Sequence, residues 1–401
     1  MRVKTGTESD QAEIAATLLA RARAMVPILA ERAKHAEQNR SIPAETIADL
    51  KQAGLFRVIQ PKRYGGYELD PGVFFDIQMT LAEGCMSTGW VYGVVAVHNW
   101  QLGLFDPRAQ EDVWAKDSSV LIASSYMPKG QVERIENEGG FKFSGRWGFS
   151  SGVDHASWLF LGGIVSTKNG VPDYRTFLLP RADVSINDNW HTVGLKGTGS
   201  KEVVIDGAFV PEYRTHRAMD GFAGTSPGLS VNTAPLYRLP FGQIFVRAVS
   251  TASIGALQGA LTAFREYGAK RVSVNDQGRT AEDPGAALAA ADAALAIDDM
   301  KLALHRNFAA MMATLRRGDA LDVNDRIHYR YQSAAVAGRC AEHIDRLFHA
   351  CGGNGIYTDN PIGRFFVDIH AARMHYANNP DKFGRNYGGV LLGLGNTDFF
   401  I

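Results

Sequence analysis

The chain has 401 residues and 45% hydrophobic content, which is enough for more than one sizeable core, so more than one domain is expected. Lys plus Arg and Asp plus Glu number 42 each, and this neutral balance gives no reason to expect nucleic acid or an anionic membrane as a partner. Cys85, Cys340 and Cys351 lack CxxC spacing, which predicts buried thiols in a reducing compartment. No apolar signal core or bilayer-length apolar run is present, so we expect a soluble, cytoplasmic protein.

Residues 1–117 are expected to form an N-terminal helical domain. Apolar residues between Ile14 and Ala33 recur at spacings of three and four, which is typical of an amphipathic helix. A long apolar segment, Phe74 to Phe105, follows. Residues 118–217 change period: short runs rich in β-branched and aromatic residues are separated by Gly, Asp and Asn, which predicts an antiparallel β domain.

Residues 218–401 return to long helical patterns and are expected to form a four-helix bundle. Leu288, Leu295 and Leu302 repeat along one expected helix, and another ends at Gly352-Gly353. Before the bundle, Met219 to Pro235 predicts a long loop that is suited to contact a substrate. The chain is therefore predicted to be an α+β protein, with helices, then strands, then helices.

This order resembles the acyl-CoA dehydrogenase superfamily, and local motifs narrow the resemblance. They are similar to the oxygenase components of two-component flavin-dependent monooxygenases, such as those of p-hydroxyphenylacetate hydroxylase and the bacterial steroid A-ring phenol hydroxylase. The motifs are Leu81–Trp90, Val97–Trp100, Trp147–Ala156, Gly197–Ser200, Val210–Arg214 and Phe366–His370 leading to His375. Together they cover essentially the whole chain. The resemblance implies the acyl-CoA dehydrogenase fold, with a middle β-barrel and a homotetrameric assembly.

The resemblance also implies a flavin site. Ser150 and Ser151 lie at a turn, and the second serine corresponds to the partner of flavin N5; ordinary turn serines are the alternative. Trp147 flanks this turn. The Gly-rich stretch with Thr198 and Ser200 is expected to approach the flavin through backbone N–H groups. Arg238 corresponds to an arginine beside the isoalloxazine, with a plain surface arginine as the alternative.

Substrate residues follow from the same comparison. His98 is a polar residue in an apolar helix; the resemblance makes it the base for a phenolic hydroxyl, and a core histidine bonded to a backbone carbonyl is the alternative. His375 is expected to face flavin and substrate, and Ser124 to act on the substrate side. We also assign Trp90 and Tyr126 to the substrate site.

Two absences bear on the reaction. An acyl-CoA dehydrogenase needs a carboxylate base, yet Ala377 stands at one family position and no Asp or Glu occurs from Phe241 to Arg265. No strand–GxGxxG–helix unit is present, so we expect a separate NAD(P)H:flavin reductase to supply the reduced flavin. His370 and His375 are five positions apart, about 140° around a helix, so they predict no metal pair.

The resulting prediction is an oxygenase component that uses reduced FMN or FAD and O2. It would form a C4a-hydroperoxyflavin and hydroxylate an aromatic, phenolic substrate at the ortho position. Oxygenation of an indole, a sulfur or an amine by the same fold is an alternative. An acyl-CoA dehydrogenase with a displaced base and a non-catalytic binding module are others.

Overall fold

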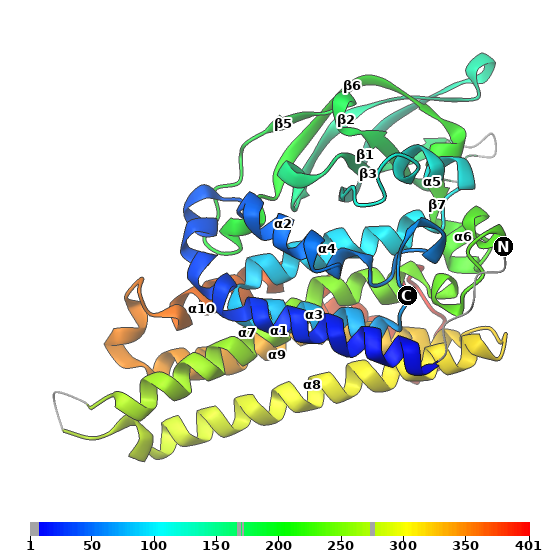
Figure 1. The fold of residues 1–401 in the computed structure, drawn as a ribbon. Coiled ribbons are helices and arrows are strands. Elements are labelled where there is room, and N and C mark those ends of the chain that lie inside the picture. Colours follow the sequence, from blue (N-terminus) through cyan, green and yellow to red (C-terminus); the bar gives the residue numbers. More distant parts are fainter. Residues whose placement is uncertain (1–7, 167–169, 171, 273–276) are drawn as a thin grey trace.

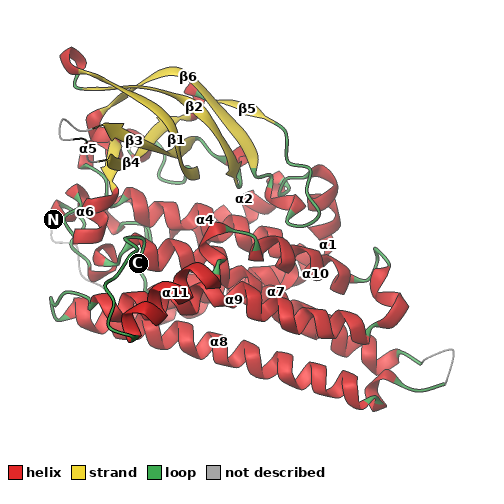
Figure 2. Cartoon of the chain, turned by 180° about the vertical axis from the view of Figure 1, so that it is seen from behind, coloured by secondary structure: helices red, strands yellow, loops and turns green. Residues whose placement is uncertain are grey.

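The computed structural model describes residues 8–166, 170, 172–272 and 277–401; most of the N-terminal stretch examined for a signal sequence lies outside these residues. Figure 1 shows a curved sheet lying over a thick layer of helices, with α8 on the side away from the sheet. Figure 2 shows the same two layers from behind.

The N-terminal region is helical. Its helices are α1 (Glu8–Asn39), α2 (Ala44–Gln52), α3 (Pro71–Gly84), α4 (Met86–Leu102) and α5 (Pro107–Trp114). The predicted apolar segment is two helices, because Cys85 adopts an extended conformation (φ −153°, ψ 112°) and separates α3 from α4. All residues of α4 are buried, as expected for a helix that is apolar on every side.

The middle region contains every strand of the main sheet. The strands are β1 (Ile122–Ile135), β2 (Gly140–Ser150), β3 (Trp158–Ser166), β4 (Pro172–Pro180), β5 (Ser185–Asn187), β6 (Lys201–Pro211) and β7 (Thr215–Arg217). Their order is β5-β6-β2-β1-β3-β4-β7. Phe141, Phe143 and Phe177 pack inside the curve of this sheet.

Two details of the sheet differ from the predicted antiparallel barrel. β1 and β3 pair in parallel, because β3 crosses to the far side of β1 after the β1–β2 hairpin. Among the described strands, the outermost ones, β5 and β7, do not pair with each other, so the sheet is strongly curved but not closed by hydrogen bonds.

The C-terminal region is the predicted bundle. It consists of α7 (Phe241–Lys270), α8 (Pro284–Arg316), α9 (Val323–Ala350) and α10 (Pro361–Arg373), with α11 (Pro380–Leu391) packed on α9. Among the described residues, α7 alone is long and apolar enough to cross a bilayer, but it is almost wholly buried as the central bundle helix. One hydrophobic core runs through the bundle and the N-terminal helices α1, α3 and α4.

Leu288, Leu295 and Leu302 lie on one helix, as predicted, and form a stripe on the outer face of α8, with exposures of 55%, 63% and 63%. One sequence interpretation in this region needs correction. The predicted loop 219–235 is largely helical, with α6 (Ala218–Ala223) and a short 3-10 helix, Pro227–Ser230; a second 3-10 helix, Pro235–Arg238, begins at its end. The three cysteines are buried and free, as predicted.

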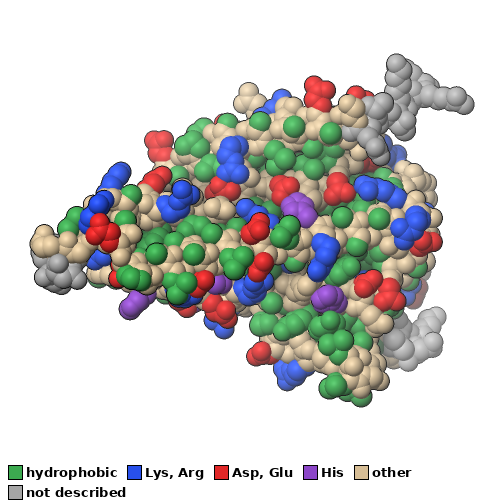
Figure 3. All heavy atoms as spheres, turned by 90° about the horizontal axis from the view of Figure 1, so that it is seen from below, with side chains coloured by type: hydrophobic (Ala, Val, Ile, Leu, Met, Phe, Trp, Pro, Cys, Tyr) green, Lys and Arg blue, Asp and Glu red, His purple; other side chains and the backbone are tan. Residues whose placement is uncertain are grey.

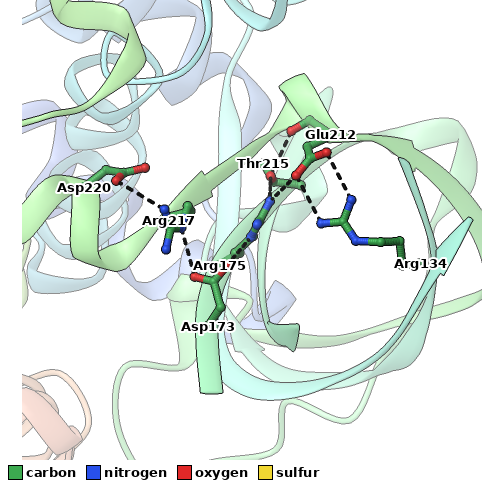
Figure 4. Close-up of polar contacts among 7 residues, drawn as sticks. All are labelled: Arg134, Asp173, Arg175, Glu212, Thr215, Arg217 and Asp220. Atoms are coloured by element: carbon green, nitrogen blue, oxygen red, sulfur yellow. Dashed lines mark hydrogen bonds and ion pairs between the residues drawn. The ribbon is translucent and has the colours of Figure 1, made fainter. Parts of the chain in front are cut away.

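A network of ion pairs joins the sheet to α6 (Figure 4). Asp173 on β4 is buried and accepts from Arg175 at 2.8 Å and from Arg217 at 3.2 Å. Arg217 also lies 3.8 Å from Asp220 in α6. Because Asp173 and Arg175 are less than a tenth exposed, this network fixes the start of α6 more firmly than a surface pair would.

Candidate functional site

Helix α4 carries two of the predicted site residues, Trp90 and His98. They are eight positions apart, which places them about 12 Å apart along the helix axis. Both side chains are buried, at 5% and 0% exposure. Trp90 contacts the turns at the end of β2 and the start of β6, whereas His98 contacts β1. The site therefore has two parts, one around each residue.

His98 has one ring nitrogen satisfied and one free. Its Nδ1 lies 2.5 Å from the backbone oxygen of Ile122, so Nδ1 carries the proton and donates it. Its Nε2 is buried and has no hydrogen-bond partner among the described residues. Burial lowers the pKa of His98 to about 4, so the imidazole is neutral at physiological pH and Nε2 is an available acceptor. The alternative interpretation, a histidine bonded to a backbone carbonyl, is thus right for one nitrogen only.

Aromatic rings surround His98. Phe160 and Tyr126 meet the imidazole edge-on at 5.5 and 6.1 Å, and Phe245 stacks at 6.2 Å. The Tyr126 hydroxyl donates to Gln101, one turn after His98 on α4. Ser124 lies two residues before Tyr126 on β1 and is also buried, so strand alternation places both side chains on one face.

A small, partly open cavity of about 30 Å³ adjoins this aromatic cluster. Gln101 and Tyr126 line its inner end. Its other walls come from β4, β7, α6, the starts of α7 and α9, and the segment that follows α11. Its free space is about that of one water molecule, so its walls must move apart before an aromatic ring can enter.

The second part of the site is a chain of hydrogen bonds from α4 to two loops of the β domain. The Trp90 indole N–H donates to Ser151 Oγ at 3.1 Å, and Ser151 Oγ bonds in turn to Ser200 Oγ. The Gly152 N–H donates to the backbone oxygen of Thr198 at 2.9 Å, which ties the two loops together. Ser150 Oγ is buried and has no partner among the described residues. The side chains of this part thus retain unused hydrogen-bonding capacity.

The loop that ends at Ser200 is held from the bundle side. Asp368 on α10 is buried, and its Oδ1 accepts the Leu195 N–H at 2.5 Å. Burial raises the pKa of Asp368 to about 7. The hydroxyl and the N–H of Thr198 both donate to the Leu195 oxygen, at 2.7 and 3.1 Å, which fixes the conformation of this turn. Asp368 thereby links α10 to the Thr198–Ser200 turn.

His375 joins this part from the turn after α10. Its ring lies edge-on to Trp90 at 5.7 Å. Its Nδ1 accepts the backbone N–H of Ala377 at 3.1 Å, so the neutral ring carries its proton on Nε2. Burial and the nearby Arg330 guanidinium lower the pKa of His375 to about 4. His375 therefore presents an N–H, whereas His98 presents a lone pair.

The structure does not bring two predicted residues to this site. The Trp147 indole lies inside the curved sheet, fully buried, and its N–H donates to the oxygens of Met127 and Gly162 at 3.1 and 3.0 Å. Trp147 therefore packs in the core of the β domain, and its indole N–H is already bonded there and is not available to a flavin. Arg238 is exposed at the end of a 3-10 helix before α7, as a surface arginine would be.

Other residues of the site were not predicted. His216 lines the cavity, bonds Ser226 Oγ through Nε2 at 3.0 Å and stacks on Phe105. Burial lowers the pKa of His216 to about 4. Gln101 could have been found, because it follows His98 by three positions on an apolar helix. Tyr174 and Arg326 carry no local signal, because distant contacts bring them to the cavity.

Comparison with known proteins identifies the family. Residues 8–116 match the model of the acyl-CoA dehydrogenase N-terminal domain, and residues 248–380 match that of the C-terminal domain. The chain is 41% identical to the flavin-dependent monooxygenase oxygenase subunit HsaA of Rhodococcus jostii, over 94% of this chain and 99% of the relative. The chain belongs to this family of flavin-dependent monooxygenase oxygenase subunits. It is therefore an enzyme, and it uses reduced flavin.

Two further comparisons agree with this family assignment. The crystal structure of the HsaA monooxygenase from M. tuberculosis superposes with a TM-score of 0.91 at 39% identity, covering 96% of this chain and 100% of that one. The oxygenase component of the FADH2-dependent resorcinol hydroxylase of a Rhizobium species is 30% identical over 94% of each chain. The predicted family, the α+β fold class and the enzyme class are confirmed.

The residues around Ser151 fit a flavin. An isoalloxazine ring is flat and carries hydrogen-bonding atoms on its edges, so it needs an apolar face and several polar partners. The Trp90 indole offers an aromatic surface, and the hydroxyls of Ser150, Ser151 and Ser200 offer partners. The His375 Nε2–H has no partner among the described side chains and adds a donor.

Proposed function

We propose that this oxygenase subunit hydroxylates a phenol next to its hydroxyl group and that His98 is the base that takes up the phenolic proton. The observation that carries the proposal is the buried Nε2 of His98, which has no partner among the described residues and is surrounded by aromatic rings. A ring hydroxyl fits such a position, because it donates to Nε2 while its ring packs against the neighbouring side chains. The name of the resorcinol hydroxylase relative supports a phenolic substrate.

Proton removal makes the ring a better nucleophile. A phenolate donates more electron density to its ortho carbon than a neutral phenol does, so a base at the hydroxyl accelerates attack on an electrophilic oxygen. With dioxygen, reduced flavin supplies that oxygen. Tyr126 lies between the cavity and His98, so its ring would lie against the substrate. Ser124, on the same face of β1, would contact the substrate as well.

We further propose that the flavin is held between α4 and the two β-domain turns. Ser151 would bond N5 of the ring, with Ser150 and Ser200 beside it and the backbone of Thr198 close by. Trp90 would pack against the flavin or the substrate. His375 would donate its Nε2–H into the same space and orient the reacting groups. The full burial of α4 would exclude water from both parts.

The two histidines are held in opposite tautomers. Because a backbone oxygen fixes the proton of His98 on Nδ1, its Nε2 can only accept. Because a backbone N–H occupies Nδ1 of His375, its Nε2 can only donate while the ring is neutral. One side chain therefore serves as the acceptor and the other as the donor, without any change of charge before the substrate arrives.

The family name implies a partner that reduces the flavin. We propose that an NAD(P)H:flavin reductase delivers reduced FMN or FAD by diffusion in the cytoplasm. We also propose a homotetramer. Figure 3 shows hydrophobic side chains among the charged ones on the underside of the bundle. The exposed stripe Leu288, Leu295 and Leu302 on α8 suits a second copy of the chain.

Dehydrogenation of an acyl-CoA has no support at the position of the expected base. Ala377 is buried there, with a methyl group in place of a carboxylate. Oxygenation of an indole, a sulfur or an amine remains the alternative for a substrate without a hydroxyl. In that case His98 would only orient the substrate.

Rapid mixing tests the proposal. The protein, loaded anaerobically with reduced FMN or FAD, is mixed with oxygenated buffer that contains candidate phenols, and flavin absorbance and products are followed. We expect a transient that precedes oxidised flavin and a catechol-type product. Direct reoxidation without a transient and without product, with either flavin, would contradict the proposed function.

A further inference from the structure

The outer wall of the substrate cavity is built from two segments that are far apart in the sequence. One is α6, which contributes Ala218, Gly221 and Phe222. The other is the segment 394–401 that follows α11, which contributes Phe399, Phe400 and Ile401. Figure 2 shows this end of the chain returning to the side of the molecule where α6 lies.

Segment 394–401 follows a defined path. The Asn386 amide on α11 donates to Asn396 Oδ1 at 2.9 Å, and its oxygen accepts from the backbone and hydroxyl of Thr397 at 2.9 Å. The Phe400 N–H donates to Asp398 Oδ1 at 2.9 Å. These bonds use side chains to hold backbone groups, which is typical of a segment with one preferred conformation.

The segment also lies directly against the first turn of α7. A Cβ added at Gly242 would lie 2.5 Å from the carbonyl carbon of Phe400 and 2.6 Å from the nitrogen of Ile401. These are backbone atoms, so only a glycine permits this approach. The absence of a side chain at Gly242 therefore leaves room for the backbone of residues 400–401 against α7.

Phe400 links the segment to the wall of the active site. Its ring lies edge-on to Tyr174 at 5.8 Å and to Phe241 at 6.5 Å. The Tyr174 hydroxyl donates to the backbone oxygen of Tyr126 at 2.5 Å, and Tyr126 contacts His98. Phe400 is thus connected to the proposed base through three contacts, so displacement of the segment would open the cavity close to His98.

Arg326, in the first turn of α9, contacts both segments of the wall. Its Nη2 and Nε donate to the backbone oxygen of Ile401 at 2.8 and 3.2 Å. Its guanidinium lies over the Phe222 ring of α6 at 4.4 Å. Arg326 is 6% exposed, and none of the ion pairs of the described residues includes it. Its charged group is therefore used for these two contacts.

We propose that Arg326 is a positioning residue that clamps segment 394–401 to α6 and so closes the substrate cavity during oxygen transfer. The inference rests on the proposed function, because it assigns this cavity to the phenolic substrate. Arg217 and Asp173 hold the start of α6 to the sheet, so α6 offers a fixed surface against which Arg326 holds the segment (Figure 4). A closed wall keeps the substrate in place and water out.

The test compares three variants with the unchanged protein. Arg326→Met removes the clamp and keeps a side chain of similar length. Gly242→Ala displaces the segment without touching Arg326, and it favours the helix in which it lies. Arg339→Met is the matched control, because Arg339 is an exposed residue of the same helix that pairs with Asp299 at 3.4 Å.

Three quantities are measured: KM for the phenol, hydroxylated product formed per flavin oxidised, and the oxygen reaction of the reduced flavin without substrate. For Arg326→Met and Gly242→Ala we expect KM to rise about tenfold, since a hydrogen bond to a charged group contributes roughly that factor. We also expect more hydrogen peroxide per flavin and an unchanged reaction without substrate. Arg339→Met should match the unchanged protein in all three.

Hydrogen exchange of residues 394–401 provides a readout that does not depend on turnover. Faster exchange in both variants, but not in the control, supports the clamp. Unchanged exchange and unchanged KM in either folded variant would overturn it. If Arg326→Met does not fold, Gly242→Ala decides. If no phenol is hydroxylated by the unchanged protein, the proposed function fails, and exchange alone then decides whether Arg326 holds the segment.

Discussion

Replacement of His98 by asparagine tests the proposed base with little other change. The asparagine amide occupies the position of Nδ1 and can still donate to the Ile122 oxygen, whereas the acceptor at Nε2 is lost. His98→Ala loses both. We therefore expect His98→Asn to keep most of the stability of the protein, and His98→Ala to lose about 0.5–1.5 kcal/mol more.

The magnitude follows from two pKa values. The pKa of His98 is about 4, so at pH 7 almost all of the imidazole is neutral and available as a base. A free phenol with a pKa of about 10 is only about 0.1% ionised at pH 7. A histidine with so low a pKa takes up the phenolic proton only as the ring attacks the oxygen, so without it we expect the loss of about 10²–10⁴-fold that is usual for a general base.

The assay is single-turnover product formation by protein loaded with reduced flavin, from pH 6 to 9. In His98→Asn the rate should rise about tenfold per pH unit, while the unchanged protein should show no inflection near pH 6.5. A substituted phenol with a pKa of about 7 should lose only about twofold at pH 7. If the loss is the same at every pH and for both phenols, His98 is not the base.

Three further outcomes are expected. Ser151→Ala should weaken flavin binding and also lower the free energy of unfolding by about 1–3 kcal/mol, because it leaves the buried Trp90 indole N–H unpaired. Trp147→Phe should lower the free energy of unfolding by a similar amount, because it leaves buried carbonyls unpaired, but it should leave flavin binding unchanged. Equilibrium dialysis distinguishes the two variants, and urea unfolding checks their stability. The folded pKa values of His98, His216 and His375 are about 4, so at each of them the unfolded state binds more protons between pH 6.5 and 4, which lowers stability by up to about 3 kcal/mol as the pH falls. Asp368, whose folded pKa is about 7, acts in the opposite direction between pH 4 and 7. Urea unfolding should therefore show a net loss of stability from pH 6.5 to 4, and a flat profile would be inconsistent with these shifts. Leu295→Asp should lower the mass of the assembly measured by light scattering, and an unchanged mass would place the contact between copies elsewhere.

The sequence predicted the features that depend on local pattern. The order of helices and strands follows from hydrophobic period, and His98 stood out because a polar group in an apolar helix needs a partner. Its tautomer could not be predicted, because the partner is a backbone oxygen on a strand 24 positions later.

Trp147 shows how a motif can mislead when strand alternation is ignored. Phe141 and Phe143 face into the curve of the sheet, and Trp147 continues the same alternate positions on β2. The period of two therefore predicts an inward side chain, whereas Ser150 is the last residue of the strand and Ser151 lies in the turn that follows. The motif predicts a site at this turn, but strand alternation decides which side chains point toward it.

Features made by distant contacts could not be predicted. The parallel pairing of β1 and β3 depends on strand order, which leaves no trace in the pattern of either strand. The exposed leucines of α8 have the same spacing as core residues, so period alone cannot distinguish a face buried in the fold from one that is not. Arg326 meets Phe222 and Ile401, which lie 104 and 75 positions away, only after the chain has folded.

Helix α4 sets the distance and the angle between the proposed flavin residues and the proposed substrate residues. Trp90 and His98 are separated by a fixed rise and a fixed rotation, because both belong to one uninterrupted buried helix. One residue inserted between them would turn one part of the site by about 100° relative to the other. A change in the length of the loops around the cavity would alter which ring systems enter it. An insertion in α4, by contrast, would move the proposed flavin site away from the proposed substrate site.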